Sequence, residues 1–436
     1  MMQKIRLTAL SIFIATAALF IGCSLLPVGS TPRSQPTSPQ NPVISTASPS
    51  MGVTLPPEQA LTETARQNHL IVWLPPEFNP SGQPAGTLFE SRVTDFEQNH
   101  PGMEVEIRIK EVDGAAGMLA ALETTLEVAP GAAPSLALML QTDLETAVMD
   151  GLLQSPPGLA EIMEQEDWYA YAREMGQVQN EYFGVPFAAD AMILVVRSSG
   201  VQTEIQTWDQ VLSATRPLLF PASDAQSLFT LNLYLSAGGK LFDEENHPFL
   251  DPGVLTQVLE FYKTASEEGT LASSSTDFSN YTQTWDAFNK RMSNQTICWL
   301  SDYLWLGRLD EHGSVIPALG SESVTLVSGW MWAVTDPYEE RIETDLALLS
   351  TLIQPDFQAG WIESAGYLPV RPSSLEAWEQ PRQMALLSQA TISAVSQPGN
   401  EILNLFGPVL SEAVYNVITG AVQPAEAARL AAEKIN

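Results

Sequence analysis

The sequence predicts an α/β protein with two lobes, for two reasons. The first is length, because 436 residues exceed what a single compact core usually supports. The second is an alternation of apolar patterns, with strands expected at 70–73, 103–110 and 136–140 and a helix at 116–128. A further helix-like stretch separates the first two strands. Strands that alternate with helices pair in parallel, so we expect each lobe to be a mainly parallel sheet flanked by helices.

Two acidic residues follow these expected strands directly. Ligands of parallel sheets bind beyond the carboxyl ends of the strands. In this chain those ends are followed by residues 75–78, which include Glu77, and by residues 141–143, which end at Asp143. We therefore expect Glu77 and Asp143 at the rim of a binding cleft.

Charge argues against a nucleic-acid partner. The chain has 20 Lys and Arg against 51 Asp and Glu, a net charge of −31, and it contains no basic run. Binding to a phosphate backbone depends on clustered Lys and Arg, which release counterions. The acidic excess is typical of a protein kept soluble outside the cell, and it says nothing about the ligand.

The sequence carries no signature of catalysis, of a metal site or of another cofactor. Its four His and two Cys residues are scattered, without the spacing of metal ligands. Cys298 lies in an apolar run, which favours a small buried side chain. No G-x-S-x-G, S-x-x-K or H-E-x-x-H motif is present, and 238–241 lacks the residues of a phosphate-binding loop. We expect a protein that is not an enzyme and has no cofactor.

The N-terminal segment has the features of an export signal. Residues 1–22 combine a short basic start with an apolar core, as in a signal peptide. The junction 20–23 (FIGC) resembles the bacterial lipobox, which implies that Cys23 is lipidated and becomes the new N-terminus. A plain N-terminal membrane anchor is the alternative. Residues 23–59 are rich in Pro, Ser and Thr, which predicts a disordered tether.

Three helix starts can be read from capping patterns. Thr207 with Gln210 fits a capping box, and Ser223 with Gln226 repeats the spacing ahead of an apolar helix at Leu228. The sequence Asp-Pro-Gly at 251–253 predicts a third start.

Several motifs occur in an order that resembles a known family. They are 181–196 with its lone acid at Asp190, 238–243 (GGKLFD), 298–305, 328–335 (SGWMWAVT), 366–371 (GYLPVR) and the closing stretch 409–436. From about residue 69 to the end, the chain resembles the extracellular solute-binding proteins of ABC importers, family 1, the group that includes maltodextrin-binding proteins.

The resemblance implies a periplasmic-binding-protein type II fold whose two lobes are joined by three hinge crossings. Lobe 1 would comprise 69–188 plus 324–366, and lobe 2 would comprise 191–315 plus 371–436. The three crossings are expected near 187–191, 315–323 and 366–370.

The resemblance also implies a set of cleft residues. Aromatic side chains would pack against the apolar face of a sugar ring, and carboxylates would accept hydrogen bonds from its hydroxyl groups. The aromatic candidates at family positions are Trp73, Tyr303, Trp305, Trp330 and Tyr367. The acidic candidate is Asp190, with Glu77 and Asp143 as further candidates. Whether Tyr303 or Trp305 points into the cleft stays open, and core packing is the alternative for each Trp.

The function implied is that of a monomeric, exported, lipid-anchored protein on the outer side of the membrane. It would capture a solute, most simply a mono- or oligosaccharide, by hinge closure and deliver it to a permease driven by a cytoplasmic ATPase. Three alternatives remain: a binder of a polyamine or other non-sugar solute through cation–π contacts, a secreted glycoside hydrolase with two catalytic acids, and a lobe that feeds a sensor kinase.

Overall fold

The computed structural model describes residues 68–80, 84–112, 114–197, 205–213, 217–306 and 311–436. They belong to a compact unit that starts at Leu61. The predictions for the signal peptide, for Cys23 and for the tether at 23–59 concern residues outside these ranges. Within these ranges no helix is long and apolar enough to cross a membrane.

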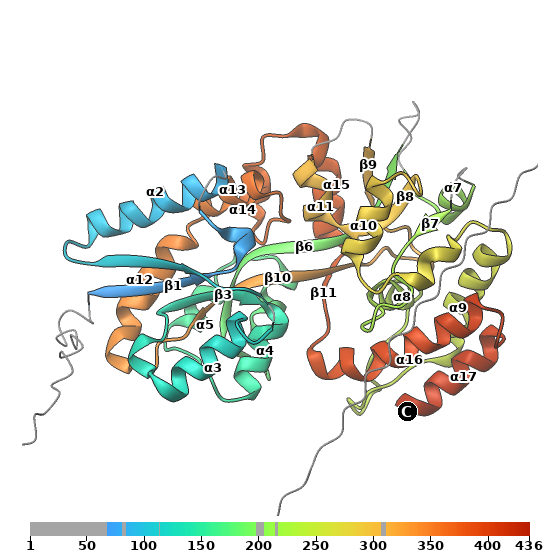
Figure 1. Cartoon of the computed structure of the whole chain (residues 1–436), viewed down its shortest axis with the longest axis horizontal. Coiled ribbons are helices and arrows are strands. Elements are labelled where there is room, and N and C mark those ends of the chain that lie inside the picture. The colour runs from blue at the N-terminus through green and yellow to red at the C-terminus, as the bar shows by residue number, and fades with distance from the viewer. Residues whose placement is uncertain (1–67, 81–83, 113, 198–204, 214–216, 307–310) are drawn as a thin grey trace, which may run out of the picture. The chain divides into compact units, whose positions relative to one another are not determined.

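Strands and helices alternate through the first half of the unit, and helices dominate the second half (Figure 1). The strands are β1 (His69–Leu74), β2 (Glu104–Ile109), β3 (Leu136–Leu140), β4 (Gln177–Val178), β5 (Glu181–Tyr182), β6 (Gly184–Arg197), β7 (Leu218–Leu219), β8 (Gln295–Trp299), β9 (Glu311–Val315), β10 (Thr325–Val334) and β11 (Ala394–Ser396). The short 3-10 helices are η1 (Pro76–Phe78), η2 (Pro130–Ala132), η3 (Ser273–Asp277) and η4 (Glu339–Arg341).

The α-helices before β9 are α2 (Pro84–Asn99), α3 (Met118–Val128), α4 (Gln141–Met149), α5 (Leu159–Met163), α6 (Ala170–Met175), α7 (Trp208–Leu212), α8 (Leu228–Ser236), α9 (Pro252–Glu267), α10 (Tyr281–Asn289) and α11 (Leu300–Leu306). Those after it are α12 (Ile342–Leu352), α13 (Pro355–Ala365), α14 (Pro372–Glu376), α15 (Pro381–Ser393), α16 (Asn400–Ile418) and α17 (Pro424–Ile435). The predicted α/β class is confirmed.

A nine-stranded sheet has the order β2-β1-β3-β10-β6-β8-β7, with β11 paired to β10 and β9 paired to β6, and β4 pairs with β5 in a separate two-stranded sheet. The pairs of β1 with β2 and β3, of β7 with β8 and of β10 with β11 are parallel. The pairs that involve β6, and the pair of β10 with β3, are antiparallel. The sheet is therefore mixed rather than mainly parallel, because β6 and β10 run through its centre in opposite directions.

Strands β6 and β10 connect two groups of helices (Figure 1). The first half of β6 pairs with β10, and its second half pairs with β8 and β9. Around β1 and β3, the apolar core includes residues of α2, α12 and α13. A second core gathers residues of α8, α9, α16 and α17. Both long strands contribute to both cores, so they are the connection about which the two groups of helices are arranged.

The positions of the three predicted crossings stay a prediction, and the structure shows the contacts that each stretch makes. The first is the middle of β6, and the third lies beside it, since Leu368 and Ala189 exchange two backbone hydrogen bonds of 2.7 and 3.1 Å. In the stretch predicted as the second crossing, 315–323, Ile316 is buried in the second core and the Leu319 N–H donates to Ser236 of α8. The lobe boundaries themselves stay a prediction.

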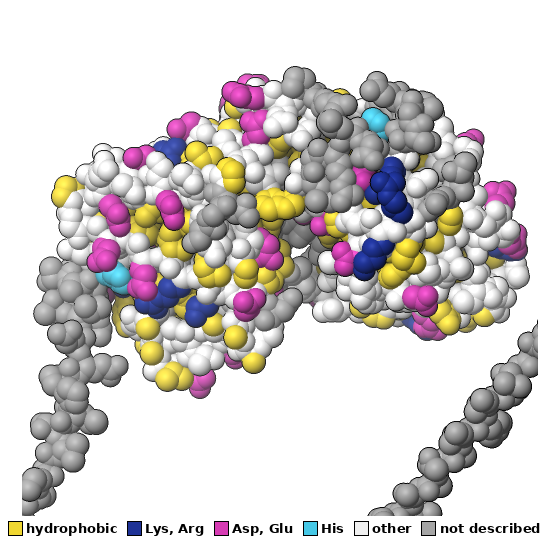
Figure 2. Space-filling view, turned by 45° about the horizontal axis from the view of Figure 1, so that its top comes forward, with side chains coloured by type: hydrophobic (Ala, Val, Ile, Leu, Met, Phe, Trp, Pro, Cys, Tyr) yellow, Lys and Arg dark blue, Asp and Glu magenta, His cyan; other side chains and the backbone are white. Residues whose placement is uncertain are grey.

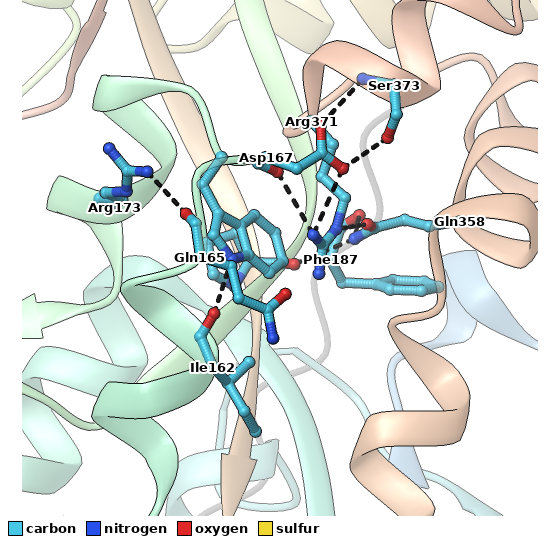
Figure 3. Close-up of polar contacts among 10 residues, drawn as sticks. Ile162, Gln165, Asp167, Arg173, Phe187, Gln358, Arg371 and Ser373 are labelled. Carbon is cyan, nitrogen blue, oxygen red and sulfur yellow. Dashed lines mark hydrogen bonds and ion pairs between the residues drawn. The ribbon is translucent and has the colours of Figure 1, made fainter.

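A buried arginine fixes the first and third crossings to α13 (Figure 3). The Arg371 guanidinium donates to Gln358 Oε1 at 2.8 Å, and its carbon lies 3.4 Å from the ring centre of Trp168. The amide of Gln358 donates to the carbonyls of Pro186 and Phe187 in β6, at 3.1 and 2.9 Å. Asp167 forms an ion pair with Arg371 at 3.5 Å. Burial lowers the pKa of Arg371 to about 10, which still leaves it charged at neutral pH.

Two of the three predicted helix starts are confirmed. Thr207 and Gln210 form a full capping box, and the Asp251 carboxylate accepts from the N–H groups of residues 253 and 254. The second box, Ser223 with Gln226, is wrong. Ser223 donates its hydroxyl to the Thr276 carbonyl instead, and the Asp224 carboxylate accepts from the Leu228 N–H at 3.0 Å. The Asp224 carboxylate also accepts from the Gln226 N–H, while Ser227 occupies the N-cap position of α8 and makes no capping hydrogen bond with its side chain.

Candidate functional site

The site is built around a cavity of 570 Å³ where four segments of the chain meet. The segments are η1 with the start of α2, the end of α10, the helix α11, and α13 with the residues after it. Its aromatic lining consists of Phe78, Trp285, Trp305, Trp361 and Tyr367. Its polar lining consists of Glu77, Asn79, Asp286, Asn289, Ser301, Asp302 and Ser364. A cavity of this size, apolar with a few polar groups, is typical of a small-molecule site.

Phe78 lies at the centre of the aromatic wall. Its ring stacks on Trp361 with centroids 4.8 Å apart and on Tyr367 with centroids 5.5 Å apart. The edge of Trp330 meets it at 4.9 Å. These rings are nearly covered, whereas the side chain of Trp305 remains 61% exposed. Trp305 is therefore the aromatic surface most available to a ligand, and the other rings form a rigid backing.

Asp190 lies behind the cavity. It sits in the middle of β6, opposite Ser328 of β10. Its carboxylate accepts hydrogen bonds from the N–H of Ser301 at 3.0 Å and from the hydroxyl of Ser301 at 2.5 Å. Burial raises the pKa of Asp190 to about 7, although the two bonds from Ser301 act in the opposite direction. Near neutral pH this carboxyl can exchange its proton.

A second acid with a raised pKa lines the cavity directly. Burial raises the pKa of Asp302 to about 6, and the nearby charge of Asp286 acts in the same direction. Asp302 lies in the first turn of α11, where a carboxylate is favoured by the N–H groups of the helix. Burial also raises the pKa of the Tyr367 hydroxyl, so that group is neutral and can donate a hydrogen bond.

The site is acidic. Three carboxylates line it, those of Glu77, Asp286 and Asp302, and the described part of its lining includes no Lys, Arg or His. Figure 2 shows acidic side chains spread over one face of the molecule, with few basic ones among them. The arrangement favours a ligand that donates hydrogen bonds or carries positive charge over a ligand that is an anion.

The structure brings together only some of the residues expected from the sequence. Glu77, Trp305 and Tyr367 line the cavity, and Asp190 adjoins it through Ser301. Trp330 is covered and lies beside Phe78.

Tyr303, Trp73 and Asp143 are placed elsewhere. The Tyr303 hydroxyl lies 3.4 Å from the Glu311 carbonyl, on the side of α11 that faces β9. Trp73 is 2% exposed within β1, and Lys110 covers its ring at 4.3 Å. Asp143 lies in the first turn of α4 and is not part of the cavity lining. Tyr303 and Trp305 diverge because the segment is a helix, in which side chains two residues apart point about 160° apart.

Sequence reasoning missed the contributions of α10 and α13. Trp285, Asp286 and Asn289 lie on α10, and Trp361 and Ser364 lie on α13. The adjacent pair Trp285-Asp286, an aromatic next to an acid, is the one local signal of a site there.

Within the described residues no group of three or more His, Cys, Asp or Glu could hold a metal ion. Cys298 is fully buried, as predicted.

The chain was compared with protein-family models, with curated proteins and with solved structures. A family model described as bacterial extracellular solute-binding protein matches residues 91–385. No curated protein matches the chain.

Solved structures of low sequence identity share the fold. Maltose-bound MalE3 of T. maritima has a TM-score of 0.65 at 16% identity, over 84% of this chain and 98% of that chain. The sugar-binding protein MalE of Xanthomonas citri has a TM-score of 0.65 at 17% identity, over 84% and 96%. An ABC transporter solute-binding protein of Thermotoga lettingae, bound with α-D-tagatose, has a TM-score of 0.64 at 18% identity, over 85% and 99%. These likenesses confirm the predicted two-lobed fold.

Proposed function

The chain belongs to the bacterial extracellular solute-binding proteins, and on this premise we propose that it captures a saccharide in the cavity beside α10, α11 and α13 and delivers it to an ABC permease. As a member of an extracellular family, the protein is exported. In this proposal the protein only binds the saccharide and releases it to the permease. A cytoplasmic ATPase supplies the energy of transport.

One observation carries the proposal: the exposed indole of Trp305 lies over a cavity that also holds carboxylates and amides. The C–H face of a sugar ring packs on a flat aromatic side chain, and its hydroxyl groups donate to carboxylates such as those of Asp286 and Asp302. The structural relatives named above include proteins bound with maltose and with α-D-tagatose, which supports the same ligand class.

Capture would proceed by closure about β6, β10 and the stretch at 366–370. A ligand shifts an open–closed equilibrium only through contacts that differ between the two states. The cavity lining supports this, because it combines η1 and α2 with α10 and α11, which belong to segments separated by the crossing strand β6. Small-angle scattering tests closure: the radius of gyration falls when the ligand saturates the protein, and an unchanged radius contradicts it.

The function itself is tested by a thermal-shift screen over saccharides, polyamines and organic anions. A ligand at 100 times its Kd stabilises the fold by about 2.7 kcal/mol. Calorimetric titration of Trp305→Ala with the ligand identified should then show a loss of roughly 1–3 kcal/mol, or about ten- to a hundredfold in Kd. Tyr415→Ala is the matched control, since that aromatic is 51% exposed on α16 and lies outside the cavity. Equal affinity of the two variants for the ligand would show that Trp305 is not part of the binding site.

A second candidate is a cationic solute such as a polyamine. The observation that favours it is the set of carboxylates in a cavity whose described lining holds no basic residue. Asp286→Asn separates the two ligand classes. A sugar loses little affinity, because an amide still accepts a hydrogen bond, whereas a polyamine loses a counter-charge.

Of the candidate functions, catalysis has the least support. A glycosidase places two carboxyl groups about 5–5.5 Å or 6.5–9.5 Å apart across the bond that it cleaves. The structural relatives named above are binding proteins, which favours a carrier over a glycosidase. Turnover of any oligosaccharide that the screen identifies would establish a hydrolase in place of a carrier.

The attachment to the membrane is also proposed. Residues 1–22 would be a signal peptide, Cys23 would carry lipid, and 23–59 would tether a monomeric binding unit. Cys23→Ala should release the protein from the membrane fraction or block its processing. Unchanged attachment with an uncleaved N-terminus would instead indicate a helical anchor.

A further inference from the structure

The helix α4 packs on the face of β6 and β10 that is opposite the candidate site. The ring of Trp330, in β10, meets Phe78 of the candidate site with centroids 4.9 Å apart. Its neighbour Met331 points to the other face, because successive residues of a strand do so. A Cβ at Gly184 of β6 would lie 3.3 Å from Met331 Cβ and 2.7 Å from Leu144 Cδ2 of α4. The two strands therefore separate α4 from the candidate site.

On that face α4 is hydrogen-bonded to the start of α16. The backbone N–H of Asn400, the first residue of α16, donates to Glu145 Oε2 at 2.6 Å. The side-chain amide of Asn400 donates to the Thr142 carbonyl at 2.7 Å and to Thr146 Oγ1 at 3.0 Å. A carboxylate is favoured at the N-terminus of a helix, where the N–H groups have no partners within the helix. Three hydrogen bonds, one of them to a carboxylate, thus join α4 to α16.

The contact extends beyond these three bonds and spans the two groups of helices. Gln141, the first residue of α4, donates to Ser396 Oγ at 3.1 Å and to the Gln397 carbonyl at 3.2 Å. Gly399 permits the close approach, since a Cβ there would lie 2.5 Å from Glu145 Oε1. The helix α4 contributes to the core around β1 and β3, whereas α16 contributes to the second core.

This contact and the proposed closure are mechanically opposed. Closure brings α10 and α11 toward η1 and α2 by rotation about β6 and β10. The same rotation draws α16 away from α4, because these two helices meet on the opposite face of the strands. In the structure the indole of Trp305 is 61% exposed while Asn400 is bonded to Glu145. The accessible site and the intact contact therefore occur together.

We propose that the contact of α4 with α16 is a latch that holds the protein open, and that the hydrogen bonds of Glu145 and Asn400 limit its affinity for a saccharide. The inference rests on the proposed function. The apparent Kd equals the intrinsic Kd divided by the fraction of protein in the binding-competent state. Removing the latch raises the fraction that is closed, so binding becomes tighter although no residue of the site is changed.

The test is calorimetric titration with maltose, D-glucose, D-xylose and D-tagatose, together with small-angle scattering of the saccharide-free proteins. Glu145→Ala removes the charged hydrogen bond. Asn400→Asp keeps the size of the side chain but places a second carboxylate beside Glu145. In both variants we expect the Kd of the saccharide that binds to fall at least threefold and the radius of gyration without saccharide to decrease. Glu145→Gln, whose amide oxygen still accepts, should lie between Glu145→Ala and the parent.

Asp251→Ala is the matched control. The Asp251 carboxylate also accepts from N–H groups at the start of a helix, but that helix, α9, contributes to the second core together with the residues that it contacts there. This variant should lower the melting temperature while it keeps the parent Kd and the parent radius.

The outcomes separate the two proposals. If folded Glu145→Ala and Asn400→Asp bind no more tightly than the parent, the latch is wrong, while a parent that binds a saccharide still supports the proposed function. If no saccharide of the panel binds the parent, the proposed function is contradicted and scattering alone decides: an unchanged radius in both variants overturns the latch. A circular-dichroism melt of each variant verifies that it is folded.

Discussion

Asp190, in the middle of β6, accepts two hydrogen bonds from a single residue, Ser301 of α11, one from its backbone N–H and one from its hydroxyl. This contact joins the crossing strand to the helix that carries Asp302 and Trp305. Asp190 was predicted from the sequence as a ligand-binding acid. Its geometry also gives it a part in holding α11.

The first prediction concerns pH. The pKa values of Asp190 and Asp302 are raised in the folded protein to about 7 and about 6, above the values that the unfolded chain would show. Between pH 4 and 7 these two groups therefore bind more protons in the folded state, and their contribution to the free energy of unfolding rises as the pH falls. The slope is at most about 1.4 kcal/mol per pH unit for each group. Urea unfolding at pH 5, 6 and 7.5 measures it.

Asp190→Asn should flatten this dependence, since the amide does not titrate. Asp95→Asn is the control, because Asp95 is exposed on α2 and contributes only its backbone to the hydrogen bonds of the structure. A pH profile of Asp190→Asn that coincides with the parent profile would contradict the assignment.

The second prediction concerns Asp345, a fully buried acid of α12. Burial raises its pKa to about 7, and the neighbouring Asp336 adds to the shift, while Ser135 and Arg341 oppose it. Asp345→Asn should therefore stabilise the protein at pH 8, by about 1–3 kcal/mol, and change stability less at pH 5, where the parent carboxyl is protonated. Thermal melts at the two pH values check this. Destabilisation at pH 8 would mean that the contact with Arg341 outweighs burial.

Local patterns were sufficient for much of the fold. The strand β3 matches its predicted range, and the capping box at Thr207 forms as expected, because both depend on neighbouring residues alone. Trp73 and Trp330 show where local sequence patterns are insufficient to predict exposure. Each lies in a strand of a sheet with helices packed on it, so a position at a strand end did not make either an exposed site residue.

The site was harder to predict than the fold, for a physical reason. The walls formed by Trp285 and Trp361 come from helices separated by more than sixty residues, and only tertiary packing brings them together. The choice between Tyr303 and Trp305 depended on whether 300–306 is a helix or a turn, and the apolar run before it gives no periodicity that decides this. Asp190 was identified because a lone acid in an apolar run is costly to bury and so stands out.

The third prediction concerns Arg371, which is 2% exposed. Arg371→Lys removes the planar fork that bonds to Gln358 and stacks on Trp168, so about 1.5–3 kcal/mol of unfolding free energy should be lost for each charged hydrogen bond not replaced. Arg429→Lys is the control, because its partners Glu426 and Glu433 are exposed on α17, and a change within about 0.5 kcal/mol is expected there. Urea unfolding compares the two variants, and equal losses would contradict a structural role for Arg371.

The last prediction uses two glycines in left-handed conformations. Gly366 ends α13 with φ 78°, and a Cβ there would lie 3.2 Å from Leu304 Cβ. Gly420 has φ 74° with nothing within 4 Å of such a Cβ. Alanine at either position should cost about 1–2 kcal/mol of unfolding free energy from backbone strain. Only Gly366→Ala should also weaken ligand binding, because it displaces the helix that carries Trp305. Calorimetry with the ligand from the screen measures this, and equal affinities would mean that Gly366 does not set the position of α11.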